Sequence, residues 1–162
     1  MPVSLPVKFR RFLLMQAFLW WQGGFVFYAA VVVPIGTEEL GSAMAQGAIT
    51  QRVTVWLNIL GLVWHALMLW DILADRTPRS RRAEVLVASF LGLLALIILH
   101  RLMDRFFVDG LIRPADAKLF RTLHISYLWV STLHWLLGLV ALWMTLGAWM
   151  GKPGSLARLR ND

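Results

Sequence analysis

HISYLWVSTLHWLLG, residues 124–138, is apolar enough to lie in a membrane, yet it carries two histidines, a tyrosine and a serine. On an α-helix, five of its residues fall within an arc of roughly 80°: His124, Tyr127, Ser131, His134 and Gly138. A helix surrounded by lipid has no need of such a polar face, because polar groups in hydrocarbon are costly. The stretch therefore predicts a membrane helix that turns one polar face towards other helices.

The composition indicates a membrane protein. The chain has 162 residues, of which 59% are hydrophobic and 15% charged, whereas a soluble domain carries about 25% charge. We expect residues 1–162 to form a single membrane domain. The chain has no cysteine, which excludes disulfides, iron–sulfur clusters, thiolate zinc sites and cysteine nucleophiles.

Apolar runs predict four membrane helices. We expect them at about 12–35, 53–74, 84–106 and 114–150, lengths that suit the ~20 residues needed to cross a bilayer. Pro34 and Gly36 are expected to end the first helix, and Pro114 suits the first turn of the fourth. The tail, residues 151–162, is expected to be flexible. The predicted fold class is an all-α integral membrane protein, a four-helix transmembrane bundle.

The charged residues predict an orientation. The net charge is +7, but Lys and Arg lie in short segments between apolar runs, where they set topology and contact anionic headgroups. We therefore expect no nucleic-acid partner. Most of these residues precede the first helix, join the second to the third, or follow the fourth. This pattern predicts an inner (plasma) membrane protein of bacterial type, multi-pass, with both termini cytoplasmic. The lipid bilayer is its expected partner, and membrane protein partners or a homo-oligomer remain open.

The second helix repeats the polar face of the fourth. The residues that lie within one arc of roughly 80° on this helix are Thr54, Asn58, Gly61, His65 and Met68. His65 follows the boundary residue Arg52 by thirteen positions, and His134 follows Arg121 by the same number. At 1.5 Å per residue, both histidines lie ~20 Å below that boundary. We expect them to face each other near the middle of the membrane.

Three interpretations of this pair stay open. His65 and His134 are candidate cofactor-binding residues, because two imidazoles can ligate a haem b inside a four-helix bundle. Small residues such as Gly61 and Gly138 would then leave room for the ring. Alternatively, each histidine forms a hydrogen bond with a neighbouring polar side chain or carbonyl and only packs helices. Another ligand, or contact with a quinone, is a further possibility.

The other two histidines form a second level near the outer surface. His100 and His124 are candidate ligands of a divalent metal, with Asp104 close by in the sequence, since imidazole and carboxylate suit zinc, copper or iron. Their spacing matches no recognised metal motif, and a second haem on this pair is an alternative. A proton path between the two levels is also conceivable, but the middle of the bundle has no Asp or Glu, which argues against a pump.

The first helix carries a family resemblance. WWQGGFVFYAAVVVPIG, Trp20–Gly36, resembles small bacterial membrane proteins related to eukaryotic transmembrane protein 205. In that family a W-x-G-G-x-x-F-like run precedes a proline at the outer helix end. The residues that would take those places here are Trp21, Gly23, Gly24, Phe25 or Phe27, and Pro34. The resemblance implies a four-helix fold and a membrane location, and it implies no reaction, because the family has no settled biochemical activity.

The function predicted from the sequence is that of a polytopic inner-membrane protein, structural or accessory, with no enzymatic activity assigned. The alternative is a haem b (or metal) binding membrane redox protein ligated by His65 and His134.

Overall fold

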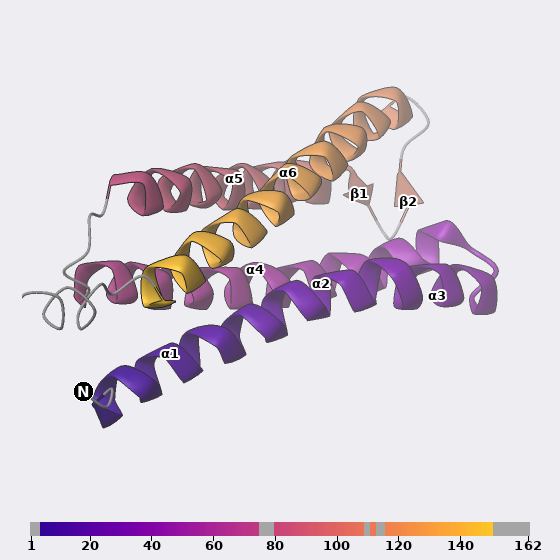
Figure 1. The fold of residues 1–162 in the computed structure, drawn as a ribbon. Helices are drawn as coiled ribbons and strands as arrows, with labels where there is room; N and C mark the ends of the chain where they lie inside the picture. The colour runs from indigo at the N-terminus through magenta and orange to yellow at the C-terminus, as the bar shows by residue number, and fades with distance from the viewer. Residues whose placement is uncertain (1–3, 75–79, 109–110, 113–115, 151–162) are drawn as a thin grey trace, which may run out of the picture.

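A computed structural model describes residues 4–74, 80–108, 111–112 and 116–150 (Figure 1). Four helical spans in it are long and apolar enough to cross a membrane: Leu5–Glu39, Met44–Ala74, Arg81–Asp104 and Ala117–Met150. The prediction of an all-α integral membrane protein, a four-helix transmembrane bundle, is thereby confirmed. The tail predicted to be flexible, residues 151–162, lies outside the described residues.

The first span is one continuous helix that contains two wider π turns. Its parts are α1 (Leu5–Phe18), η1 (Leu19–Gly23), α2 (Gly24–Phe27), η2 (Tyr28–Val32) and α3 (Val33–Glu39). The prediction that Pro34 ends this helix is wrong. The Val33 N–H bonds the Tyr28 carbonyl, five residues back, and the wider turn leaves room for the proline ring. The helix ends instead before Gly41, whose φ of 58° suits glycine.

The second span also begins earlier than expected. α4 (Ala43–Ala74) starts ten residues before position 53, so most of the segment expected as a loop is helical. The Ser42 hydroxyl accepts a hydrogen bond from the Ala45 N–H at 3.3 Å, which satisfies one of the free N–H groups of the first turn. A helix cap and the absence of proline therefore extend this helix beyond its apolar run.

The last two spans lie close to their expected places. α5 (Ser80–Asp104) ends two residues before position 106, and α6 (Ala117–Met150) begins three residues after position 114. Between them, β1 (Phe107–Val108) pairs antiparallel with β2 (Leu111–Ile112). This short hairpin turns the chain back towards the bundle.

The helices run up and down, so the start of α1 and the end of α6 lie at the same end of the bundle (Figure 1). We call this the terminal end and the opposite one the distal end. α4 packs against both α1 and α5, and α5 packs along α6. Polar faces of all four helices can therefore meet along the bundle axis.

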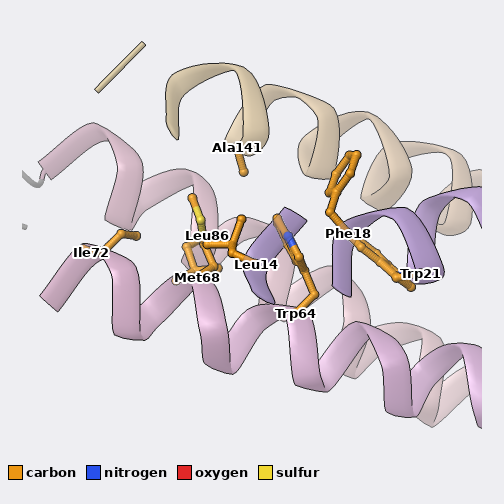
Figure 2. Close-up of a cluster of buried hydrophobic side chains, with 8 residues drawn as sticks. All are labelled: Leu14, Phe18, Trp21, Trp64, Met68, Ile72, Leu86 and Ala141. Carbon is orange, nitrogen blue, oxygen red and sulfur yellow. The ribbon is translucent and has the colours of Figure 1, made fainter. Parts of the chain in front are cut away.

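The core is narrow. Its apolar cluster takes side chains from all four spans (Figure 2): Leu14, Phe18, Trp21, Trp64, Met68, Ile72, Leu86 and Ala141. In the most apolar window of each span, only between 22% and 28% of residues are buried. The remaining apolar side chains face outward, an arrangement that suits contact with lipid.

Candidate functional site

The structure brings the two candidate cofactor ligands together. His65 on α4 and His134 on α6 are each 4% exposed. Their ring centroids are 5.7 Å apart and their ring planes differ by 15°. Both imidazoles therefore point into the bundle, as the common depth of the two positions predicted.

His65 has a protein partner on each ring nitrogen. Nδ1 lies 2.7 Å from the Gly61 carbonyl oxygen, and Nε2 lies 3.1 Å from the Ser89 hydroxyl on α5. A carbonyl can only accept, so Nδ1 donates its hydrogen, and Nε2 of the neutral ring accepts the Ser89 hydroxyl hydrogen. This imidazole joins α4 to α5 and keeps no lone pair free for a metal.

The indole of Trp21 occupies the space beside Gly61 and Gly138 in which a bound haem ring would be expected. A Cβ added to Gly61 would lie 3.2 Å from Trp21 Nε1, and one added to Gly138 would lie 3.0 Å from two carbons of the same indole. Trp21 also packs against His134, with ring centroids 4.8 Å apart, and stacks on Trp64 at the same centroid distance. The two glycines thus open a slot, and Trp21 fills it.

The π turn η1 explains how Trp21 reaches this slot. Trp21 and Gln22 are consecutive, yet both are 5% exposed, because the wider turn directs two neighbouring side chains inward. Gln22 Nε2 donates a hydrogen bond to the Trp135 carbonyl of α6 at 3.4 Å. The sequence shows the tryptophan, but a helix of 3.6 residues per turn does not place both side chains in the core.

A small cavity lies beside His134. It measures about 20 Å³, and its polar lining includes Asn58, Tyr127 and Ser131. Ser131 Oγ and His134 Nε2 are buried and have no hydrogen-bond partner among the described residues. A cavity of this size holds one water molecule, which needs two to four polar partners. The cavity is too small for a cofactor.

The arrangement does not fit haem b. Two axial ligands need a free nitrogen on each imidazole and an open slot between the rings. Both nitrogens of His65 are hydrogen-bonded, and Trp21 occupies the space that Gly61 and Gly138 leave. Haem binding would require Trp21 to leave the core and His65 to give up a hydrogen bond.

The candidate metal ligands line a different space, at the distal end. A pocket of about 240 Å³ lies between α3, α4, α5 and α6. Its lining includes His100 and His124 as well as Thr50, Thr54, Asp104 and Tyr127. We call it the distal pocket. His100 is 7% exposed, whereas His124 lies exposed at the rim.

The distal pocket contains several polar side chains but is not built as a metal centre. Among the residues that the structure describes, no group of three or more His, Asp or Glu side chains could hold a metal ion. His100 Nε2 lies 3.7 Å from Asp104 Oδ1, and Gln51 Nε2 donates to the same oxygen at 2.7 Å. A metal on His100 and His124 would therefore need ligands that the described protein does not supply.

A third polar level at the terminal end was not predicted from the sequence. Asp71 on α4 is 0% exposed and accepts hydrogen bonds from three other helical segments. Arg10 of α1 donates to Oδ1 at 2.9 Å, and Arg82 of α5 donates to Oδ2 at 2.7 Å. Trp149 of α6 donates to Oδ2 at 3.1 Å. One carboxylate thus joins all four spans.

The apolar cluster separates this Asp71 centre from the histidine pair. Met68 lies between His65 and Asp71 along α4, and together with Trp64 it belongs to the apolar cluster. Both side chains are 0% exposed. A polar path that enters from the distal pocket through Tyr127 and the small cavity therefore stops at these side chains. This geometry does not support proton transfer across the membrane.

Comparisons of the chain with protein-family models, with curated proteins and with solved structures found no match.

Proposed function

We propose that the protein is a structural or accessory protein of a bacterial-type inner membrane and that its buried histidines hold helices together. The observation that carries this proposal is the bonding of His65, whose two nitrogens contact Gly61 and Ser89. Trp21 packs the remaining space between the histidines and their glycines. Satisfied polar groups of this kind add specificity to helix contacts in a membrane.

The proposal includes both termini in the cytoplasm. Arg10 and Arg82 lie at the terminal end, around Asp71, and an excess of basic residues favours the cytoplasmic side. The test is a pair of reporters, one fused after Asp162 and one inserted after Gly41 at the distal end. We expect cytoplasmic activity from the first and external activity from the second, and the reverse result overturns the orientation.

The cofactor question is tested on the purified full-length protein. We expect no Soret band, no haem on extraction and no stoichiometric zinc, copper or iron by mass spectrometry. A Soret band that shifts on dithionite reduction, and that is lost in the variant with both His65→Leu and His134→Leu, would establish the haem alternative instead.

One observation favours that alternative. His134 Nε2 has no described partner, and its ring lies opposite His65 at 5.7 Å. The Trp21→Ala variant separates the two functions, because it removes the indole that fills the slot beside Gly61 and Gly138. Haem uptake by this variant alone shows that the native indole excludes the cofactor, whereas uptake by the native chain overturns the proposal.

The relationship to proteins resembling transmembrane protein 205 stays a prediction. The WWQGG stretch that suggested it has a structural explanation here, because Trp21 and Gln22 are core residues of η1. Gly24 lies against Leu57 of α4, because a Cβ added to Gly24 would be 3.5 Å from the Leu57 Cδ2 atom. A role of these residues in close helix packing is compatible with a common fold and says nothing about a reaction.

A further inference from the structure

We propose that the distal pocket binds a small aromatic molecule that bears a hydroxyl group, a phenol or a quinol. The proposal goes beyond the packing role of the buried histidines and does not depend on it. It is carried by an unpartnered imidazole, a neighbouring carboxylate and an aromatic wall, which all border one pocket.

The size of the distal pocket fits a single substituted ring. Its volume is about 240 Å³, whereas an apolar cavity of about 150 Å³ is enough to bind benzene. The additional volume accommodates one or two small substituents. The lining mixes polar side chains with Val33 and Met103, as expected for a ligand that is largely apolar and carries a few polar atoms.

The hydroxyl is required by the gap between two polar groups. His100 Nε2 is buried and lacks a hydrogen-bond partner among the described residues, and it lies 3.7 Å from Asp104 Oδ1. This separation exceeds a hydrogen bond, but one oxygen atom can lie about 2.8 Å from both atoms. A hydroxyl there donates to the carboxylate and accepts from the imidazole. An ether oxygen cannot donate, so it satisfies only one of the two.

The carboxylate is held in place for this contact. Asp104 is the last residue of α5. Gln51 of α4 donates a hydrogen bond to its Oδ1 at 2.7 Å, which fixes the position of the carboxylate. His100 is 7% exposed, so its Nε2 has lost water without gaining a hydrogen-bond partner from the described part of the chain, a state that costs free energy. A bound hydroxyl removes that cost.

The aromatic body of the ligand is favoured by α6. Phe120 and His124 stack with centroids 6.1 Å apart and planes 11° apart, and Tyr127 follows on the same face of the helix. All three border the pocket, with Met103 of α5 across from them. Flat rings pack well against aromatic and thioether groups, so a planar ring is preferred over a saturated one.

The ligand can come from two sources. A free phenol enters from the aqueous side, whereas a phenol or quinol with an alkyl tail enters from the bilayer. Both present the same hydroxylated ring to His100 and Asp104, and the experiment separates them by the tail.

The test uses the full-length protein in lipid nanodiscs and fluorine NMR of 4-fluorophenol. We expect specific line broadening that 4-ethylphenol reverses. Binding of 4-fluoroanisole, which lacks the donor, and of 4-fluorocyclohexanol, which lacks the aromatic ring, should be at least tenfold weaker. 4-Nonylphenol placed in the bilayer identifies a membrane source if it displaces the probe at lower total concentration than 4-ethylphenol. The opposite order identifies the aqueous source.

The variants form a matched pair. A Cβ at Gly47, which borders the distal pocket, meets no atom of the described residues within 4 Å, and the same holds for Gly147 near the far end of α6. Gly47→Leu should fill the pocket and abolish binding, while Gly147→Leu should leave binding within twofold. Both replace glycine in a helix by a better helix former, so folding is preserved in each.

A second variant addresses the hydroxyl. His100→Phe keeps a ring but removes the nitrogen, and we expect 4-fluorophenol to bind at least tenfold more weakly. The proposal is overturned if native protein does not broaden the probe, if the ether binds as tightly as the phenol, or if Gly47→Leu binds like the native chain.

Discussion

The indole of Trp21 rests directly on Gly138, where an added Cβ would lie 3.0 Å from two ring carbons. This contact joins the first span to α6 at the level of the buried histidines. A flat cofactor would bind in the slot that Gly61 and Gly138 leave open, but in this protein the Trp21 side chain fills that slot. The histidine pair is consequently part of a packed core.

The first prediction is that Trp21→Ala strongly destabilises the bundle. Removing a buried Trp side chain costs about 3–5 kcal/mol in folded cores, and Trp21 also contacts Trp64 and His134. The free energy of unfolding, measured by titration with sodium dodecyl sulfate in mixed micelles, should fall by that amount. The neighbouring Trp20 is 68% exposed, so Trp20→Ala should leave the transition nearly unchanged. Equal effects of the two variants would contradict the packing described here.

The second prediction uses two glycines. Gly138→Ala should lower the free energy of unfolding by about 1–3 kcal/mol, the usual cost of overpacking, because Trp21 and Gln22 must move away from the new methyl group. Gly23→Ala is the control. A Cβ at Gly23 meets nothing within 4 Å, so this change should be neutral or stabilising by about 0.5–1 kcal/mol. The same micelle titration measures both, and a harmless Gly138→Ala would mean that the slot is wider than the structure has it.

The architecture follows from the sequence more directly than the site does. Runs of apolar residues determine four spans, and the equal distance of His65 and His134 from Arg52 and Arg121 gives their common depth. Trp21 was not identified as the residue between them, because a π turn shifts the direction of every side chain near it. Ideal helix periodicity does not contain that shift.

The Asp71 centre escaped prediction for a different reason. Arg10 and Arg82 lie beside apolar runs, where basic residues are normally explained by membrane topology. Their sequence neighbours do not distinguish a solvated arginine from one that reaches into the bundle. The sequence did contain one indication of this centre, the carboxylate of Asp71 at the end of an apolar span, with arginines at the same end of two other spans. Only the packing of α1 and α5 against α4 brings those groups together.

The third prediction concerns Ser89. Ser89→Ala leaves His65 Nε2 without its partner, and a buried unsatisfied polar group costs about 1–3 kcal/mol. The free energy of unfolding should decrease by that amount. Thr132→Ala on α6 provides the comparison, because its exposed hydroxyl bonds only the Leu128 carbonyl of its own helix at 3.0 Å. If Ser89→Ala is as mild as Thr132→Ala, the hydrogen bond between α4 and α5 does not contribute to stability.

The fourth prediction is that Asp71→Asn is among the most destabilising single changes in the chain. It removes the negative charge from a buried centre and leaves Arg10 and Arg82 uncompensated, a change that costs about 3–5 kcal/mol in buried ion pairs. The micelle titration should show this loss. Glu84→Gln, an exposed carboxylate at the same end, should have little effect.

A combined variant separates the charge from the packing. Replacing Asp71 by Leu together with Arg10→Met and Arg82→Met removes every ionic member of the centre. Buried ion pairs exchanged for apolar side chains of similar volume are often neutral or stabilising, so this triple variant should recover most of the stability that Asp71→Asn loses. If it is instead less stable than Asp71→Asn, the carboxylate contributes net attraction that apolar contacts cannot replace. In that case the four spans depend on Asp71 for more than charge balance.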